Sequence, residues 1–306
     1  MRVVRLLLTV LLFTGVGAAQ QDRNPITQRS QVALPQAESG AVTTEKDVVY
    51  ASIKGTDLHL DIYEPSADRG TAPRPAVILI HGGGWSSFDK STMRGMGEFL
   101  ARHAFVAFSV DYRLFTGKEN LWPVQLDDVQ RAVRWVRAHA SKYNVDPDRI
   151  GAFGHSAGAQ LAALLGMEDT RDNSDAALAK YSSRVRAVVD VSGPTDFTIP
   201  DDPEGEAFMA SFLGVAYAKN PEAWRDASPV FHVGKKNAAF LIVHGTQDES
   251  VPLAQAQELF DKMRIAGETA KFVKVNDRHT FESPEARRQL AIETLQFFDE
   301  YIAGPQ

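Results

Sequence analysis

Short apolar segments alternate with longer segments of helical periodicity along most of this chain, and this alternation limits the folds that it can adopt. Between the strand-like segments, apolar residues recur at helical spacing, as at Leu126, Val129, Val133 and Val136. Strands that alternate with helices form βαβ units, so we expect an α/β fold with a mainly parallel sheet and helices on both faces. The apolar runs with the length of a buried strand are Val77–Ile80, Phe105–Val110, Ile150–Phe153, Val185–Val191, Phe240–Val243 and Phe272–Val275.

Two earlier segments predict an antiparallel addition to this sheet. Val48–Ile53 and Leu58–Tyr63 are joined through Gly55-Thr56-Asp57, a sequence that favours a hairpin at the sheet edge. We therefore expect the folded domain to span residues 48–306. A chain of this length can bury a substantial core in one domain.

The second half of the chain predicts two further helices and one irregular segment. Leu253–Ala266 and Pro284–Ala303 have helical periodicity and are followed by Gly267 and Gly304, which favour helix ends. The segment 200–233 contains several large apolar residues without a clear strand. It predicts either a small lid over a site or a surface excursion that packs on the core.

The first residues have the pattern of an export signal. Arg2 and Arg5 flank the start of the apolar run Leu6–Val16, and small residues follow as far as Ala19. The run is well short of the roughly 20 residues that a membrane span needs, so we expect no stable membrane anchor. This pattern predicts a signal peptide at 1–19, cleavage near Ala19 and an exported product, periplasmic or secreted. Residues 20–47 are polar and predict a tail of low order.

Composition argues against several classes of partner and cofactor. The formal net charge is -6 and no basic run is present, so a nucleic-acid partner has no electrostatic support. The chain has no cysteine, which excludes disulfides and thiol chemistry. It contains no H-E-x-x-H motif or similar group of metal ligands, and we expect neither a metal nor a cofactor.

The strongest local motif is Gly154-His155-Ser156-Ala157-Gly158, which follows a predicted strand and opens a predicted helix. A serine at such a tight strand-to-helix turn has an exposed hydroxyl, and the flanking glycines prevent clashes with the backbone. Ser156 is therefore the expected nucleophile. The rival interpretation, a dinucleotide-binding loop, requires a G-x-G-x-x-G spacing that these glycines do not have.

A second motif, His81-Gly82-Gly83-Gly84-Trp85, follows the strand that ends at Ile80. Acyl transfer places negative charge on a carbonyl oxygen, and fixed N–H groups that point at this oxygen lower the barrier. We expect the N–H groups of Gly83, Gly84 and Ala157 to form such an oxyanion hole. Taken alone, three glycines also fit a flexible loop. Trp85 is a candidate substrate contact, and its alternative role is packing beneath the loop.

A base and an acid complete the predicted site, in the chain order Ser, acid, His. Asp248 and His279 each follow a predicted strand, which brings them to the same sheet edge as Ser156. We expect His279 to take the serine proton and Asp248 to orient the imidazole. Asp196 also follows a strand and is an alternative acid, although capping of its own turn explains it more simply. Asp277 is close to His279 in the chain and is expected only to order the loop.

Taken together, these residues resemble bacterial feruloyl-esterase and acetyl-xylan-esterase-like proteins, a group labelled BD-FAE that is akin to the hormone-sensitive-lipase esterases. The resemblance implies an α/β-hydrolase fold with Ser156, Asp248 and His279 as its catalytic triad. Relatives often have glycine at the positions of Ala159 and of Asn276–Arg278. The matching segments are HGGGW at 81–85, DYRL at 111–114, the stretch 122–150, GHSAG at 154–158, SGPTDF at 192–197, ASPVFHV at 227–233 and HGTQDESVP at 244–252.

The resemblance further implies that Asp111-Tyr112-Arg113 braces the oxyanion loop and does not react. The function expected from residues and resemblance is a carboxylic ester hydrolase that forms an acyl-enzyme intermediate. Its partner would be a small-molecule or polysaccharide-linked ester. The alternatives are an amide hydrolase or exopeptidase with the same triad, and a binding protein without catalysis.

Overall fold

The structure is a computed structural model that describes residues 41–66, 72–199, 203–234 and 236–304. The signal peptide expected at 1–19 and the part of the tail at 20–40 lie outside the described residues. The first strand begins at Val42, so the folded domain starts earlier than the predicted boundary at 48. Residues 42–47 are mostly exposed, and this explains why their polar sequence did not indicate a strand.

Eight strands form one sheet in the order β1-β2-β4-β3-β5-β6-β7-β8. All neighbours from β4 to β8 are parallel, whereas β1 and β2 pair antiparallel with each other and β2 pairs antiparallel with β4. The predicted mainly parallel sheet is therefore confirmed. The strands are β1 Val42–Ile53, β2 Thr56–Pro65, β3 Arg74–Ile80, β4 Val106–Val110, β5 Val145–His155, β6 Ala187–Val191, β7 Ala239–Gly245 and β8 Ala270–Val275.

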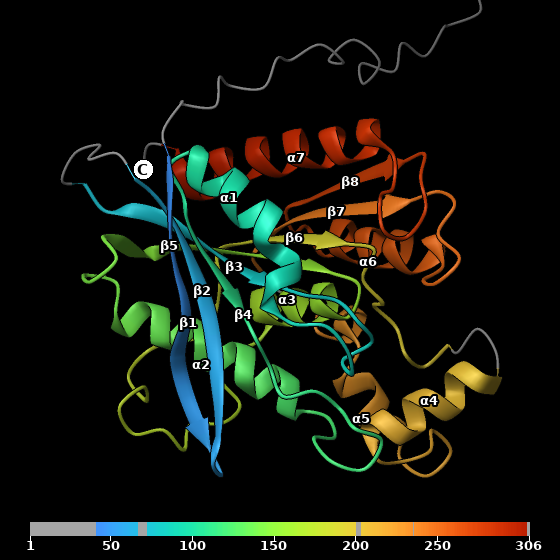
Figure 1. Ribbon diagram of the computed structural model, residues 1–306. Coiled ribbons are helices and arrows are strands. Elements are labelled where there is room, and N and C mark those ends of the chain that lie inside the picture. Colours follow the sequence, from blue (N-terminus) through green and yellow to red (C-terminus); the bar gives the residue numbers. More distant parts are fainter. Residues whose placement is uncertain (1–40, 67–71, 200–202, 235, 305–306) are drawn as a thin grey trace, which may run out of the picture. The chain divides into compact units, whose positions relative to one another are not determined.

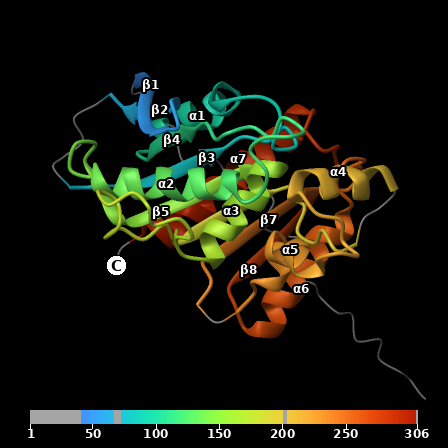
Figure 2. The same cartoon turned by 90° about the horizontal axis from the view of Figure 1, so that it is seen from below.

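Helices cover both faces of this sheet (Figures 1 and 2). Helices α1 and α7 lie on one face, and α2, α3 and α6 lie on the other. The central strands are buried on both faces, which explains their continuous apolar sequences. The helices are η2 Lys90–Met93, α1 Arg94–Arg102, α2 Val124–Ala138, α3 Ala157–Met167, α4 Pro203–Leu213, α5 Pro221–Asp226, η3 Pro229–Phe231, α6 Leu253–Ala266, α7 Pro284–Phe298 and the π-helical turn η4 Asp299–Ala303.

The chain turns between β1 and β2 through Lys54 and Gly55, both with positive φ (49° and 84°). Ile53 pairs with Thr56, so the hairpin has a two-residue loop that begins one residue earlier than predicted. Helix α6 ends, as predicted, at Gly267, which adopts the left-handed conformation that favours glycine. Helix α7 ends at Phe298 and continues into the π-helical turn, where the sequence had predicted one helix.

Helices α4 and α5 lie next to each other beyond the carboxyl ends of the central strands (Figure 1). Phe212 of α4 and Trp224 of α5 are fully buried. The Trp224 Nε1–H donates to the carbonyl oxygen of Val215 at 2.9 Å. The described part of the expected lid is thus anchored to the core, and residues 200–202 at its start lie outside the described residues.

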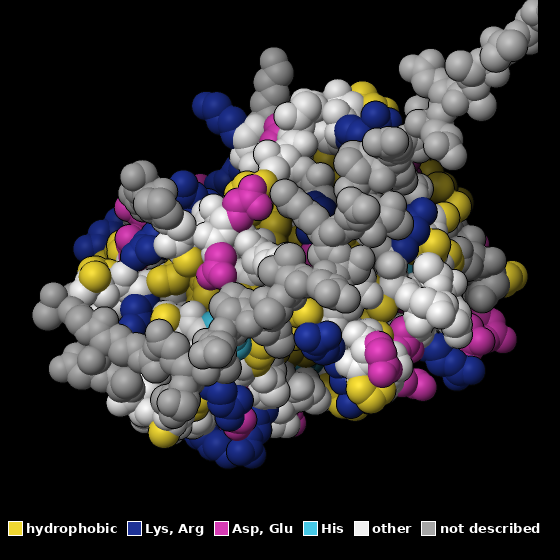
Figure 3. All heavy atoms as spheres, turned by 90° about the horizontal axis from the view of Figure 1, so that it is seen from above, with side chains coloured by type: hydrophobic (Ala, Val, Ile, Leu, Met, Phe, Trp, Pro, Cys, Tyr) yellow, Lys and Arg dark blue, Asp and Glu magenta, His cyan; other side chains and the backbone are white. Residues whose placement is uncertain are grey.

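No helix of the described chain is long and apolar enough to cross a membrane. On the face shown in Figure 3, lysine and arginine side chains are scattered between hydrophobic and acidic ones and form no continuous patch.

Candidate active site

Ser156 occupies the turn between β5 and α3 with backbone angles φ 55° and ψ -123°. This conformation is unfavourable for a residue with a side chain, and such strain is typical of functional sites. The turn is tight enough to require both flanking glycines. A Cβ atom on Gly154 would lie 2.1 Å from the carbonyl oxygen of Gly158, and one on Gly158 would lie 2.2 Å from that of Ile80. The Ser156 N–H donates to the carbonyl oxygen of Val191 at 2.8 Å and holds the turn against β6.

The glycine-rich loop after β3 passes directly beside this turn. A Cβ atom on Gly82 would lie 3.2 Å from the Ser156 Cβ, so the two segments approach as closely as their backbones allow. Gly83 and Gly84 have φ values of 104° and 56°, which favour glycine. Within the described residues, the N–H groups of Gly83, Gly84 and Ala157 donate to no protein acceptor. They are therefore available for an oxygen of a ligand.

Tyr112 packs against this loop and forms hydrogen bonds with its backbone. Its ring stacks on the ring of His81, with centroids 4.3 Å apart. Its hydroxyl donates to the carbonyl oxygens of His81 and Gly82 at 3.1 Å and 3.4 Å. Burial raises the pKa of Tyr112 well above its usual range, so the hydroxyl remains a donor. These contacts agree with a bracing role for the segment Asp111-Tyr112-Arg113.

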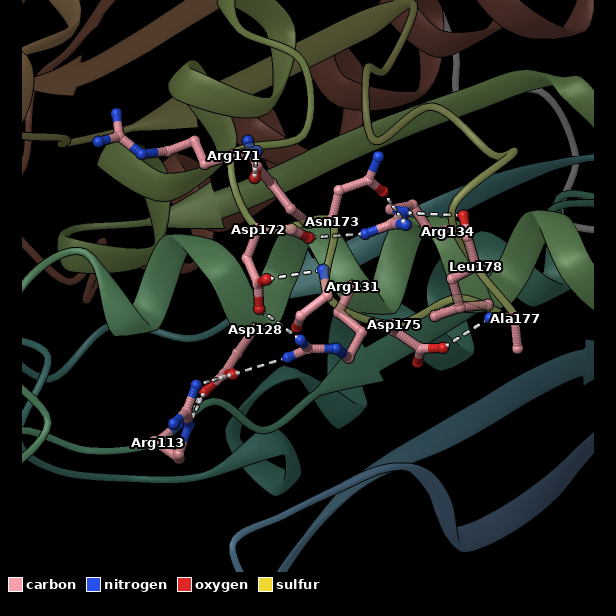
Figure 4. A network of polar contacts seen from close by, with 12 residues as sticks. Arg113, Asp128, Arg131, Arg134, Arg171, Asp172, Asn173, Asp175, Ala177 and Leu178 are labelled. Carbon is pink, nitrogen blue, oxygen red and sulfur yellow. Dashed lines mark hydrogen bonds and ion pairs between the residues drawn. The ribbon is translucent and has the colours of Figure 1, made fainter.

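Arg113 fixes the same segment to helix α2 through a buried ion pair (Figure 4). Its Nε and Nη2 atoms donate to the two carboxylate oxygens of Asp128 at 2.8 Å and 2.7 Å. The Asp128 side chain is fully buried, and the bidentate geometry compensates for its desolvation. Further along α2, Arg131 pairs with Asp172 at 2.7 Å, and the buried Arg134 donates to the carbonyl oxygen of Asp172 at 2.9 Å. The network thus joins the loop that carries Tyr112, helix α2 and the segment after α3.

Trp85 packs beneath the oxyanion loop. Its side chain is only 4% exposed, stacks on Phe212 of α4 at a centroid distance of 4.6 Å, and is not among the residues that line the cavity at Ser156. Its Nε1–H donates to Gln160 Oε1 at 3.0 Å. This placement corresponds to the packing alternative and not to the substrate contact expected from the sequence. The aromatic side chain of this loop that does line the cavity is Phe88.

The structure brings Asp248 and His279 together, as the sequence predicts. Asp248 follows β7 and His279 follows β8, and His279 Nδ1 lies 2.7 Å from Asp248 Oδ2. The other carboxylate oxygen, Oδ1, accepts hydrogen bonds from the N–H groups of Ser250 and Val251, each at 2.8 Å. Burial opposes ionisation of Asp248, but hydrogen bonds from His244, His279 and these two amides outweigh it and hold its pKa well below its usual range.

His244, at the end of β7, contacts the proposed acid and was not identified in the sequence analysis. It is fully buried, and its Nε2 atom lies 2.8 Å from the carbonyl oxygen of Val251 and 3.2 Å from Asp248 Oδ2. Both neighbours are acceptors, so Nε2 carries the proton. The sequence feature that could have indicated His244 is its position four residues before Asp248, at the end of the same buried strand.

His155 connects the nucleophile turn to the histidine loop. Its Nε2–H donates to the carbonyl oxygen of His279 at 2.9 Å, and the two imidazole centroids are 4.9 Å apart. Burial lowers the pKa of His155 below its ordinary value and favours the neutral ring. Ser156 and His279 both line one cavity, although no hydrogen bond joins the hydroxyl to the imidazole in the described structure. Hydrogen bonds between such groups are often long in the absence of a ligand and tighten when one binds.

The two competing aspartates have local structural roles. The carboxylate of Asp277 accepts hydrogen bonds from the Ser283 hydroxyl and from the N–H groups of Ser283, Arg278 and Glu282, and together they hold its pKa well below its usual range. Asp277 thereby orders the loop that carries His279. Asp196 accepts from the N–H of Thr198 at 2.8 Å, which confirms that it caps its own turn.

A cavity of about 590 Å³ opens beside Ser156. Most of its wall is apolar, and the helical part of the wall comes from η2, α1 and α7. Its volume lies in the range of ligand pockets in proteins. The lining side chains include Phe88, Thr92, Met93, Met96, Phe153, Val191, Phe281, Arg287 and Leu290, together with His155, Ser156, Ser250 and His279.

A comparison with protein families matches the model described as BD-FAE to residues 60–263. The chain belongs to the BD-FAE family. The matched segment contains the oxyanion loop, Ser156 and Asp248, whereas His279 lies beyond its end.

The sequence relatives of this BD-FAE chain and the solved structures that resemble it include esterases. The probable carboxylic ester hydrolase LipM of Mycobacterium tuberculosis is 33% identical over 229 residues, which cover 71% of this chain and 51% of LipM. The chain thus spans about half the length of LipM and of esterase LipC of the same organism. Butyrate-bound Est2 of Thermogutta terrifontis has a TM-score of 0.73 at 25% identity, over 89% of this chain and 98% of that one. A truncated carbohydrate esterase from gut microbiota has a TM-score of 0.73 at 28% identity, over 89% and 100%. These neighbours confirm the α/β-hydrolase fold.

Among the residues that the structure describes, one group of potential metal ligands lies apart from this cavity. Glu168, Asp226 and His232 bring ligand atoms within 4.8 Å of one another. Arg171 already pairs with Asp226 at 3.0 Å and with Glu168 at 3.5 Å, and His232 Nδ1 contacts Glu168 at 2.6 Å. The group is therefore best described as an ion-pair network that ties the end of α3 to α5 and η3.

Proposed function

We propose that this chain is a serine carboxylesterase that hydrolyses carboxylic esters through an acyl-enzyme intermediate. One observation carries the proposal: the 2.7 Å contact between His279 and Asp248 lies at the edge of the cavity that also contains Ser156 in its strained turn. A nucleophile, a base and an orienting acid in this order and geometry constitute the machinery of acyl transfer.

The chemistry follows from the positions of these groups. His279 Nε2 takes the proton of the Ser156 hydroxyl as the oxygen attacks the ester carbonyl carbon, and Asp248 stabilises the imidazolium that results. The N–H groups of Gly83, Gly84 and Ala157 bind the oxyanion, and each such donor contributes about 3–4 kcal/mol to the transition state. The imidazolium then protonates the departing alcohol. A water molecule, deprotonated by the same imidazole, releases the acid from Ser156.

The names of the relatives support an ester as substrate. LipM is named a probable carboxylic ester hydrolase, and the structural neighbours include Est2 with bound butyrate and a carbohydrate esterase. Small carboxylic esters and esters attached to plant-wall polysaccharides are accordingly the substrates to test first.

The decisive experiment combines turnover with covalent labelling. Ser156→Ala should lower kcat on p-nitrophenyl butyrate by 10⁴–10⁶-fold, whereas Ser141→Ala, at an exposed position outside the cavity, should leave it within twofold. Est2 is known in a form phosphorylated by paraoxon, which makes this compound a suitable label. Peptide mass spectrometry should find the phosphoryl group on Ser156 of the active protein and none in Ser156→Ala. Comparable turnover by Ser156→Ala and the unmodified chain would refute the proposal.

We also propose that residues 1–19 direct export and are removed near Ala19, on the basis of their sequence pattern. N-terminal sequencing of protein recovered from the periplasm or the medium should begin close to Gln20. Exported material that retains Met1 would contradict this assignment.

A further inference from the structure

The cavity beside Ser156 has a chemical character of its own. Its wall includes Met93 and Met96 near the start of α1 and Leu290 of α7, with aromatic side chains from β5 and the adjoining loops. Thioether and aromatic side chains adapt to apolar groups of different shapes. Among the lining residues, Arg287 is the single basic side chain apart from the histidines, and there is no aspartate or glutamate. The Arg287 guanidinium donates to the carbonyl oxygens of Phe281 and Glu282.

We propose that this cavity is a subsite for an uncharged apolar chain of an ester, and that Gly95 of α1 leaves the space into which the end of this chain extends. The inference rests on the proposed esterase function and adds the substrate class: esters with a medium-length aliphatic or aryl group. The apolar chain belongs either to the acyl group or to the alcohol, and the experiment below distinguishes the two.

Gly95 is exposed and lines the cavity, and a Cβ atom added there would meet no heavy atom within 4 Å. Its φ angle is negative, so no special backbone conformation requires glycine. Gly97, two residues further along α1, is different because a Cβ atom there would lie 2.4 Å from the ring of Tyr63. Packing thus explains Gly97, whereas nothing in the fold requires Gly95. Glycine is unfavourable in a helix compared with alanine, so neither packing nor helix propensity explains glycine at this exposed position.

An apolar subsite has a measurable signature in the dependence of rate on chain length. Each methylene that moves from water into the cavity raises kcat/KM by up to roughly fourfold, provided that it is buried in the transition state. The rise should stop when the chain reaches the end of the cavity. A side chain at position 95 should move this end closer to Ser156.

The experiment measures kcat/KM of the whole chain on two series of esters. One series varies the acyl group, from p-nitrophenyl acetate through butyrate and hexanoate to octanoate. The other varies the alcohol, from ethyl to hexyl acetate. The same series are measured for Gly95→Ala and Gly95→Leu. Arg94→Leu is the matched control, because Arg94 is adjacent on α1, exposed and absent from the cavity wall.

In the unmodified chain, kcat/KM should rise at least tenfold from the shortest to the best substrate of one series, and that series identifies the group that occupies the cavity. Gly95→Leu should lower kcat/KM on the longest members at least tenfold while acetate stays within twofold. Gly95→Ala should show a smaller effect, and Arg94→Leu none. The melting temperature of both Gly95 variants should be equal to or above that of the unmodified chain.

Two results would overturn the subsite: no dependence on chain length in either series, or a loss in Gly95→Leu that is equal for acetate and octanoate. Failure of the esterase proposal is distinguishable from both. In that case no ester of either series is hydrolysed and paraoxon does not label Ser156.

Discussion

The imidazole of His244 contacts the same carboxylate oxygen of Asp248 that His279 contacts. Asp248 Oδ2 lies 2.7 Å from His279 Nδ1 and 3.2 Å from His244 Nε2. A fully buried N–H donor at the end of β7 thus contacts this carboxylate oxygen, while His279 contacts it from the cavity. This arrangement limits the positions that the carboxylate can adopt, and with it the orientation of the imidazole that is proposed to act as base.

This relationship predicts that His244→Leu lowers kcat by about 10–100-fold with little change in KM, because a small displacement of the base weakens a step that depends on alignment. His244→Gln should recover most of the activity, since its Nε2–H₂ group reaches the position of the imidazole Nε2. Circular dichroism and melting curves would establish that both variants fold. Equal losses in folded Leu and Gln variants would show that the hydrogen bond has no role in positioning.

The assignment of the acid can be tested with two matched aspartates. Asp248→Asn should lower kcat on p-nitrophenyl butyrate by about 10⁴-fold, because it favours the wrong imidazole tautomer and leaves the imidazolium without its counter-ion. Asp196→Asn should retain activity within tenfold, since Asp196 caps a turn through Thr198. A larger loss in Asp196→Asn than in Asp248→Asn would reverse the assignment.

The buried ion pair below the oxyanion loop predicts a large effect on stability. Asp128→Ala leaves the guanidinium of Arg113 without its bidentate partner in a largely buried position, which should cost about 3–5 kcal/mol of unfolding free energy. Glu222→Ala removes an exposed pair with Arg225 and should cost less than 1 kcal/mol. Urea unfolding measures both variants. Equal costs would mean that burial of the Asp128 pair has no energetic consequence.

Asp190 of β6 predicts a pH-dependent contribution to stability. Burial raises the pKa of this carboxyl from 3.8 to about 6, and its Oδ1 accepts from the N–H of Gly193 at 3.0 Å. Between about pH 4 and pH 6 the unfolded chain has lost this proton while the folded chain retains it. The folded state is therefore progressively disfavoured as pH rises through this window, by up to about 3 kcal/mol.

The measurement compares the unfolding free energy of Asp190→Asn with that of the unmodified chain across pH. The unfolding free energy of the variant should rise relative to that of the unmodified chain between about pH 4 and pH 6. The difference between the two free energies should be constant below and above this window. Any constant offset caused by the amide itself cancels in this comparison. A difference that stays flat from pH 4 to pH 7 would contradict the raised pKa.

The strands, the nucleophile turn and the oxyanion loop could be predicted because each depends on local sequence. A fully buried strand such as β7 needs a continuous apolar run, and the turn at Ser156 needs glycine at 154 and 158. The edge strand β1 was predicted to begin later than Val42, because its exposed first half has no apolar requirement. Helix α1 was not predicted, since Gly95 and Gly97 weaken its helical signal.

Contacts between distant segments could not be predicted in the same way. The proximity of His244 to Asp248 depends on the path of the chain from 244 to 251, which returns the Val251 carbonyl to the imidazole. The packing of Trp85 on Phe212 joins residues that are far apart in the chain and depends on where α4 lies. Sequence periodicity contains no information on either arrangement.

Part of the cavity wall comes from helices that contain none of the groups proposed to react. Ser156, Asp248 and His279 follow the strands of the sheet, whereas Met93, Gly95, Met96 and Leu290 belong to η2, α1 and α7. Substitutions in these helices can therefore accumulate without disturbing the alignment of nucleophile and base. Such a division allows substrate preference to diverge quickly among related chains while the reaction stays the same, and it makes the helical wall the natural target for redesign.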